Sequence, residues 1–328
     1  MYDFIAIGDT VIDAFIKLES ASVVGTPDSS DYKICLPFAD KVPYESVTVV
    51  PAVGNAANAA VSASRLGLKT ALVSNIGDDH EGQICLEALK KNGVGTDFIK
   101  INSGAKTNYH YVLWYGPERT ILTKHESYTY ILPDINTPKW IYFSSVSANA
   151  VSFHEIVAEY LEIHPTINFA FQPGKNEIKL GKEKLSKLYA RANIFFCNVE
   201  EAGKILNIET LGINELLKRI HELGPKIVVI TDGPRGAYAY DGQEMLFAPV
   251  YPDQKPAYER TGAGDAYAST VVSALALGND LQTALMWGAT NSMSVVQKIG
   301  AQEGLLSRES LEKYLKNAPV DFKPKKIN

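Results

Sequence analysis

The sequence predicts an α/β protein with a mostly parallel sheet that is covered by helices on both faces. From Trp140 onward, short apolar strands alternate with amphipathic helices. The expected strands are 140–143, 167–171, 194–197 and 227–231, and the expected helices are 153–161, 180–190 and 213–223. Helices between successive strands indicate parallel pairing. In addition, polar residues gather where expected strands end, which is the edge at which open α/β sheets bind ligands.

The length and net charge of the chain indicate how many domains it forms and which kinds of partner it binds. The chain has 328 residues, 46% of them hydrophobic, and a formal net charge of −5. We expect one large globular domain over residues 1–328. No long basic block precedes the short Lys323–Lys326 segment, so we expect no nucleic-acid partner. Without a signal-peptide layout or a long apolar run, we also expect no membrane association and a cytoplasmic location.

The first expected strand, Phe4–Ile7, runs into a polar segment that ends at Asp13. Asp13 would lie at the carboxyl end of that strand, either as the cap of a turn or as a ligand contact.

Two pairs of short strands predict a small β lid beside the sheet. Apolar and polar residues alternate in 33–36 and 46–50, and a hairpin is expected from 108–114 and 120–123. We place the lid at about residues 14–50 and 105–125. Between its two parts, the Ala-rich segment from Val53 to Gly67 predicts a helix with a polar first turn.

Residues 258–268 predict a tight turn that opens a helix. Gly262, Ala263 and Gly264 come directly before a run with helical apolar spacing. The free N–H groups of such a turn, together with the positive end of the helix dipole, can bind an anion. Asp265 is placed to take a proton from a hydroxyl that attacks a bound phosphoryl group, although Asp is also a common helix cap. The combination indicates a kinase.

The segment Thr261–Asp265 resembles the C-terminal signature of the ribokinase-like (PfkB) carbohydrate kinases, and Gly54–Asn58 resembles their N-terminal signature. The two signatures stand in the order and separation that the family shows. The resemblance implies a ribokinase-like three-layer fold with a β lid. It also implies ATP-dependent transfer of the γ-phosphoryl group to a hydroxyl of a sugar or sugar acid, with Mg²⁺ as a cofactor.

The same resemblance implies roles for individual residues. Asp265 would be the general base, and the amides of Gly262, Ala263 and Gly264 would form the anion hole. The acceptor contacts would be Asp13, Gly54, Asn55, Asn58 and Arg119. The nucleotide contacts would be Asn198, Thr231, Gly233, Gly236 and Asn291, and Glu201 would hold Mg²⁺ through water.

Two positions depart from the family pattern. Val53 replaces the first Gly of the N-terminal signature, and Arg260 stands where the family usually has Asp before the Thr. In relatives that Asp helps to bind a monovalent cation, usually K⁺, which a guanidinium would repel. We therefore expect no K⁺ dependence, with Arg260 supplying fixed positive charge from the same loop and pairing with Glu259 or another nearby carboxylate; the alternative is that Arg260 only faces solvent and the cation site is lost without replacement.

Two other functions stay open. A nucleoside kinase would follow if the lid residues Tyr109, Tyr111 and Trp114 stack on a base, although alternating aromatic residues are more often packing or a dimer interface. The departures at Val53 and Arg260 would also suit a ligand-binding pseudokinase. The expected partners are a small-molecule acceptor and a second copy of the chain, bound through the lid.

Overall fold

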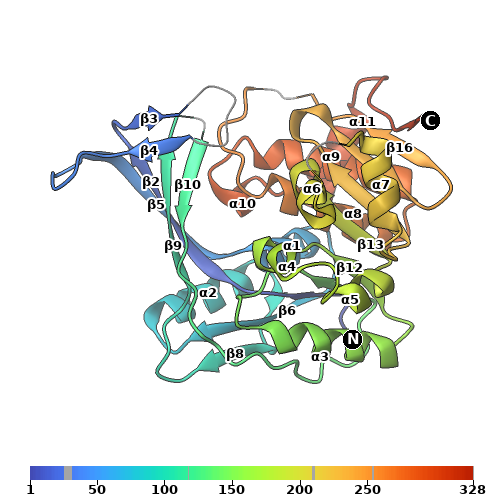
Figure 1. The fold of residues 1–328 in the computed structure, drawn as a ribbon, viewed down its shortest axis with the longest axis horizontal. Helices are drawn as coiled ribbons and strands as arrows, with labels where there is room; N and C mark the ends of the chain where they lie inside the picture. Colours follow the sequence, from blue (N-terminus) through green and yellow to red (C-terminus); the bar gives the residue numbers. More distant parts are fainter. Residues whose placement is uncertain (26–31, 117, 209–210, 253–254, 328) are drawn as a thin grey trace.

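The central sheet of the computed structural model joins strands from both ends of the chain (Figure 1). The structure describes residues 1–25, 32–116, 118–208, 211–252 and 255–327. Within these ranges the sheet has the order β17-β16-β15-β14-β13-β12-β11-β1-β6-β7, and β8 pairs with β6. The strands are β1 (Phe4–Ile7), β6 (Thr70–Gly77), β7 (Val94–Gly95), β8 (Ile99–Asn102), β11 (Trp140–Phe143), β12 (Asn168–Phe171), β13 (Ile194–Asn198), β14 (Ile227–Thr231), β15 (Ala237–Tyr240), β16 (Met245–Ala248) and β17 (Lys325–Ile327).

Strand direction follows the length of the connections. Pairing is parallel from β7 through β14, where helices connect most of the strands. It is antiparallel from β14 to β17, since short turns join β14 to β15 and β15 to β16. The predicted α/β fold with a mostly parallel sheet is confirmed.

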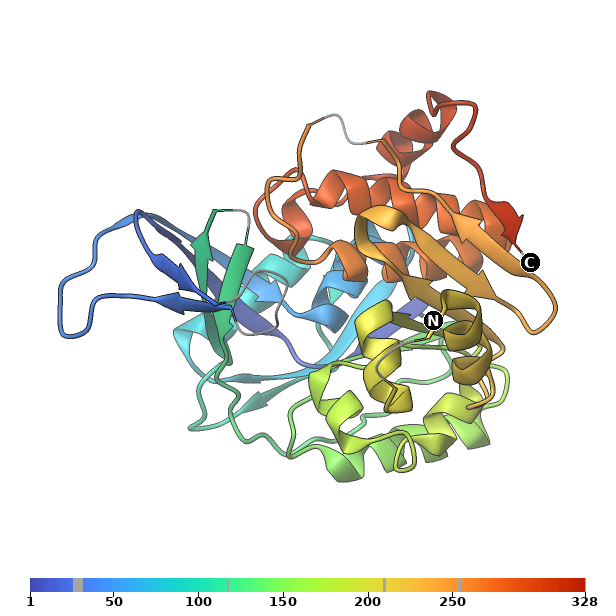
Figure 2. The same ribbon diagram turned by 45° about the horizontal axis from the view of Figure 1, so that its top comes forward.

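Helices cover both faces of the sheet because side chains alternate along each strand. In β1, Phe4 and Ala6 join one apolar core, whereas Ile5 and Ile7 join the other. The first core packs against α1 (Asn55–Arg65), α2 (His80–Lys91), α8 (Ala263–Ala276), α9 (Leu281–Val295) and α11 (Arg308–Lys316). The second packs against α3 (Val151–Ile163), α5 (Ser186–Arg191), α6 (Val199–Leu206) and α7 (Ile213–His221). Figure 2 shows α8 and α9 (orange to red) and α3 (green) on opposite sides of the sheet.

One expected helix is divided in the structure. Residues 180–190 were expected to be continuous, but α4 (Lys175–Leu180) ends before Gly181 and α5 begins at Ser186. Gly181 has φ 94°, a left-handed conformation that interrupts the helix. None of the described helices combines the length and the apolar character needed to cross a membrane.

The lid is a four-stranded sheet of order β10-β9-β2-β5 that projects from one side of the main sheet (Figure 1, left). Its strands are β2 (Val11–Leu18), β5 (Tyr44–Val53), β9 (Tyr109–Tyr115) and β10 (Glu118–Leu122). A separate antiparallel pair of strands, β3 (Ser22–Val24) and β4 (Lys33–Cys35), lies at its outer end. Of the residues expected in the lid, 26–31 and 117 lie outside the described residues.

Asp13 belongs to the lid. The expectation that it lies at the end of the first strand, with a turn cap as one interpretation, was wrong, because only residues 8–10 separate β1 from β2. Within β2, Asp13 pairs with Val50 of β5 and His110 of β9. Its side chain therefore stands on a face of the lid sheet.

Candidate active site

The first turn of α8 is shaped by a glycine that no other residue can replace without strain. Gly262 is the N-cap of α8 and has φ 76°, in the left-handed region. A Cβ atom at this position would lie 2.2 Å from the Cβ of Ala301, which is too close for any side chain. The turn therefore packs against α10 (Gly300–Glu303), while Ala263 and Gly264 line a cavity. Their proposed role in an anion hole stays a prediction.

Asp265 lies in this first turn, and its carboxylate accepts hydrogen bonds from three side-chain amides. Asn55 and Gln172 donate to Oδ1 at 3.0 and 3.2 Å, and Asn58 donates to Oδ2 at 2.8 Å. Burial raises the pKa of Asp265 above its usual value, whereas these hydrogen bonds and the charge of Arg119 act in the opposite direction. The amides thus stabilise a carboxylate in a poorly solvated position.

Further contacts determine how two of these amides are oriented. Gln302 donates to Asn58 Oδ1 at 3.0 Å and to the carbonyl of Ala52 at 2.7 Å. The Tyr142 hydroxyl donates to Gln172 Oε1. Since each amide oxygen is occupied, each amide nitrogen faces Asp265. The two signatures that the sequence places far apart meet here, with Gln172 as a contact that the sequence analysis missed.

A second set of polar side chains, which we call the polar cluster, lies where the lid meets the main sheet. It consists of Asp9, Asp13, His110 and His125. His110 Nδ1 lies 3.3 Å from Asp13 Oδ1, and His125 Nδ1 lies 3.6 Å from Asp9 Oδ2. The two imidazole rings make an edge contact at a centroid distance of 5.1 Å. Tyr130 donates to both Asp9 oxygens, at 2.7 and 3.0 Å.

The polar cluster adjoins the start of α1. Gly54 has φ 106°, and a Cβ atom there would lie 2.7 Å from the carbonyl oxygen of Asp9. This close approach places Asn55 and Asn58, and through them Asp265, next to the polar cluster. Of the cluster, the sequence analysis selected only Asp13.

Arg119 connects the lid to the turn before α8. Its Nη1 lies 3.4 Å from Oε1 of Glu259, a carboxylate that is 2% exposed. Glu259 also accepts from the N–H groups of Thr261, at 2.8 Å, and Gly300, at 3.3 Å. The proposed contact of Arg119 with an acceptor remains a prediction.

Arg260 does not pair with Glu259, so that part of our expectation was wrong. Its side chain is 58% exposed and lies 3.7 Å from Glu118, which is also exposed. The buried carboxylate of this loop is Glu259, and the guanidinium beside it comes from Arg119 in the lid. The two neighbouring residues therefore face in different directions.

The lid aromatic residues do not gather on one face. Trp114 is buried in an edge contact with Tyr258. Tyr109 and Tyr111 contact each other at a ring-centroid distance of 5.2 Å, and Tyr111 is half exposed. Since successive residues of a strand point to opposite faces, Tyr109 and Tyr111 lie on one face of β9 and Trp114 lies on the other, so these three side chains cannot surround one base.

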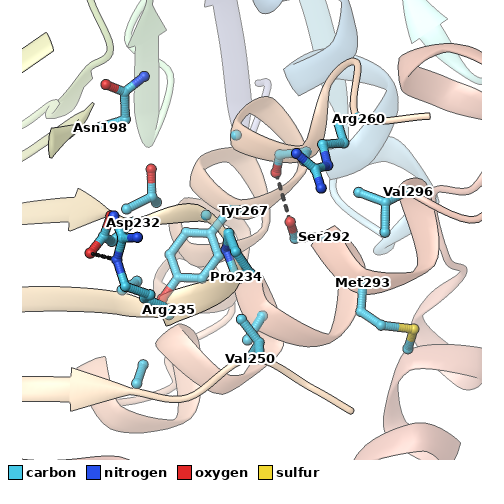
Figure 3. A pocket seen from close by; sticks show the side chains of 18 of the residues that line it. Asn198, Asp232, Pro234, Arg235, Val250, Arg260, Tyr267, Ser292, Met293 and Val296 are labelled. Atoms are coloured by element: carbon cyan, nitrogen blue, oxygen red, sulfur yellow. Dashed lines mark hydrogen bonds and ion pairs between the residues drawn. The ribbon is translucent and has the colours of Figure 1, made fainter. Parts of the chain in front are cut away.

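A cavity of about 690 Å³ opens on the other side of the α8 turn (Figure 3). Four of the residues expected to bind a nucleotide line it: Asn198, Thr231, Gly233 and Gly236. Its apolar lining, missed in the sequence analysis, includes Val250, Tyr267, Met293 and Val296. Mixed polar and apolar walls of this kind suit a small molecule with a charged end.

Asn291 is not among the residues that line this cavity. Its side chain is fully buried, donates to Thr270 Oγ1 at 2.8 Å and accepts from the N–H of Leu306 at 2.9 Å. Asn291 therefore joins α9 to α8 and to the chain after α10, which is a structural role. Ser292 and Met293 on the same helix face the cavity instead.

Glu201 forms a reciprocal cap with Asn198 at the start of α6. Asn198 N–H donates to Glu201 Oε2 at 2.9 Å, and Glu201 N–H donates to Asn198 Oδ1 at 2.8 Å. Burial raises the pKa of Glu201; the bond from Asn198 opposes this shift, and the charge of Asp265 adds to it. Among the described residues, no group of three or more His, Cys, Asp or Glu side chains forms a metal cage. A single carboxylate nevertheless fits Mg²⁺, which keeps several waters and shares its coordination with substrate phosphates.

Comparison with known proteins gives a consistent result. A family model described as pfkB family carbohydrate kinase matches residues 23–308. The chain is 29% identical over 274 residues to a ribokinase of Bacillus subtilis, covering 80% of this chain and 87% of the relative. It is 27% identical over 256 residues to a nucleoside kinase of Methanothermobacter thermautotrophicus, with coverage of 77% and 80%. Its structure resembles that of Arabidopsis thaliana ribokinase complexed with ribose and ATP, with a TM-score of 0.78, 19% identity and coverage of 96% and 99%. This likeness confirms the expected ribokinase-like fold.

Proposed function

Because the chain belongs to the pfkB family of carbohydrate kinases, we propose that it transfers the γ-phosphoryl group of ATP to a hydroxyl of a sugar or sugar acid. The observation that carries this proposal is the position of Asp265. Its carboxylate is held by three amides at the N-terminus of α8, between the polar cluster and the cavity. A proton acceptor is thus placed between two binding regions, as phosphoryl transfer to an alcohol requires.

Asp265 acts as the general base in this proposal. The acceptor hydroxyl transfers its proton to the carboxylate as the oxygen attacks the γ-phosphorus. The N–H groups of Gly262, Ala263 and Gly264 bind the charge that develops on the phosphoryl oxygens, aided by the positive end of the α8 dipole. Since the amides around Asp265 are themselves held in place, little reorganisation is needed during the reaction.

The cavity accommodates the nucleotide. Its polar residues, including Asn198 and Thr231, come from the ends of β13 and β14, where phosphates would lie nearest to α8. Its apolar residues, including Met293 and Val296, suit the base. The resemblance to a ribokinase that is complexed with ATP supports this assignment.

Glu201 would hold Mg²⁺ through water. When bound, the ion would neutralise phosphate charge and help to orient the transferred group. The carboxylate is partly buried beside Asn198, a cavity residue, and the charge of Asp265 helps to raise its pKa. This proximity supports the role.

The direct test is release of ADP from MgATP by the purified protein, with a panel of sugars, sugar acids and nucleosides. We expect acceptor-dependent release with at least one sugar or sugar acid. Activity restricted to nucleosides would favour a nucleoside kinase. The name of the relative from Methanothermobacter thermautotrophicus, a nucleoside kinase, supports this alternative. Absence of release with every acceptor, although nucleotide binds, would favour a pseudokinase.

Asp13 is expected to govern acceptor binding. It is 8% exposed, and loss of one partner of a buried hydrogen bond costs about 1–3 kcal/mol, so Asp13→Ala should raise the acceptor KM by roughly 10-fold or more. The KM for ATP should stay nearly constant, because Asp13 does not line the nucleotide cavity. Steady-state kinetics with each substrate varied in turn checks this. A rise confined to the ATP KM would contradict the assignment.

The lid also supports the proposed homodimer. Its outer face exposes four large apolar side chains: Val47, Val49, Tyr111 and Leu122, with exposed fractions of 45–51%. Such a patch on one face of a sheet is typical of a binding surface. Sedimentation equilibrium should give a dimer, and Val49→Lys with Tyr111→Lys should give a monomer. A monomeric unmodified protein at micromolar concentration would refute this proposal.

A further inference from the structure

The proposed acceptor site contains more negatively than positively charged side chains. Asp9 and Asp13 are both nearly buried, at 5% and 8% exposed, and Asp265 lies next to them through the start of α1. Glu259 adds a fourth carboxylate on the far side of Arg119. Four carboxylates therefore converge on the region that receives the acceptor.

The cations available there cannot balance these charges. Among the described residues, the basic group whose charge lowers the pKa of Asp265 is Arg119. Its guanidinium already contacts Glu259. The other candidates are the imidazoles of His110 and His125. If both carried a proton, the catalytically competent site with Asp265 ionised would still hold one more negative than positive charge. With neutral imidazoles the excess would be larger.

The buried hydrogen-bonding atoms of the polar cluster suit hydroxyl groups. Asp13 Oδ1 and His110 Nε2 are buried and form no hydrogen bond with the described residues; Asp13 Oδ1 lies 3.3 Å from His110 Nδ1, a contact that lacks hydrogen-bond geometry. A carboxylate oxygen accepts from a hydroxyl, and an imidazole nitrogen either donates to it or accepts from it. Asp13 and His110 stand opposite each other in register, so one polyhydroxylated molecule can satisfy both atoms.

We propose that this site selects an electrically neutral acceptor, that is, a sugar, a polyol or the ribose of a nucleoside, and discriminates against sugar acids and sugar phosphates. The inference rests on the proposed function and narrows its acceptor class. An acceptor that places its own negative charge about 7 Å from this excess charge, in an effective dielectric constant of about 20, should bind more than 10-fold more weakly than a neutral one. Burial of Asp9 and Asp13 limits the screening of this repulsion by salt.

The test compares acceptors that differ in charge. Binding of D-ribose, ribitol, D-ribonate and ribose 5-phosphate is measured by calorimetry on the full chain with Mg²⁺ and a non-hydrolysable ATP analogue. A second series uses D-glucose, glucitol, D-gluconate and glucose 6-phosphate, and a third compares adenosine with adenosine 5′-phosphate. Ribitol and glucitol are open-chain and neutral, so they separate the effect of charge from that of ring opening. ADP release is measured in parallel with MgATP.

We expect a neutral member to bind at least 10-fold more tightly than the anionic members of its series. Asp13→Asn, which removes one charge with little change of shape, should weaken neutral binding and reduce the neutral-to-anionic ratio several-fold. Glu45→Gln removes an exposed charge elsewhere in the lid and should leave the ratio unchanged. Thermal melts identify any variant that fails to fold. In that case the neutral-to-anionic binding ratio of the unmodified protein is the measurement that tests the inference.

Equal or tighter binding of an anionic member would overturn the inference, as would the failure of every neutral member to bind. A neutral member that binds with the expected preference but is never phosphorylated would support the inference and count against the proposed kinase activity. The binding and turnover measurements therefore separate the two claims.

Discussion

Replacement of Asp265 by Asn is expected to reduce turnover by about 10²–10⁴-fold, because the variant cannot take the proton of the acceptor hydroxyl. Nucleotide binding should be retained, since the change removes a negative charge near the phosphates. The pKa of Asp265 is raised by burial, so turnover of the unmodified protein should increase with pH through that raised pKa. The variant should lose this ascending limb.

Gln172→Ala provides the matched control. It removes one donor to Asp265 Oδ1 and leaves the carboxylate in place, so the loss of turnover should be much smaller. Because this donor stabilises the ionised form, its removal should move the ascending limb to higher pH. Thermal melts of both variants show whether the fold is intact. If Asp265→Asn lowered kcat by less than ~10-fold, Asp265 would not be the base.

The parts of the site that the sequence predicts well have local signals. Gly262 must adopt a left-handed conformation at the start of α8, and its position before a helical run of small residues is visible in the sequence. The polar first turn of α1 is equally visible. That these two helix starts meet at Asp265 could be expected only from the family resemblance, because their contact is tertiary.

The contacts that the sequence analysis missed depend on segments that approach from elsewhere in the chain. Gln302 reaches Asn58 from a one-turn helix, and nothing in its surroundings marks it. Gln172 directly follows β12 at the ligand-binding edge of the sheet, a signal that could have been used. His110 lies next to Asp13 only because β9 pairs in parallel with β2 across the lid.

Glu259 and Arg260 show why adjacent charged residues are hard to assign. A charged residue is buried only where partners exist, and the partners of Glu259 are the N–H and hydroxyl groups of Thr261, the N–H of Gly300 and the guanidinium of Arg119. None of these contacts can be read from the order of the two residues. The sequence therefore led us to expect a function for the exposed neighbour, Arg260.

Loss of Arg119 is expected to have the second-largest effect. Arg119→Ala leaves the carboxylate of Glu259 buried without its cation, which should lower the free energy of unfolding by about 2–3 kcal/mol. Glu259 also holds the N–H of Thr261, so the turn before α8 should shift and kcat should fall by at least ~10-fold. Arg119→Lys should recover the charge but only part of the turnover, because an ammonium group lacks the planar fork.

Arg260→Ala is the control for stability alone, since its contact with Glu118 at 3.7 Å is a surface pair, whereas its position in the lining of the nucleotide cavity makes a change in the KM for ATP expected. Its effect on stability should stay within about 1 kcal/mol. Chemical denaturation and steady-state kinetics of the three variants check these expectations. Equal destabilisation by Arg119→Ala and Arg260→Ala would show that the pair of Arg119 and Glu259 contributes no more than a surface contact.

The same ion pair determines the expected response to K⁺. Glu259 is the buried carboxylate of the turn, and a permanent guanidinium already lies beside it, so a monovalent cation would be repelled from this position. The unmodified protein should therefore turn over equally well in K⁺ and Na⁺ when ionic strength is held constant. In Arg119→Ala the carboxylate becomes available to a cation, and a preference for K⁺ over Na⁺ should appear as a partial recovery of kcat. Strong activation of the unmodified protein by K⁺ would show that a cation binds despite Arg119, and would refute this account of the Glu259 carboxylate.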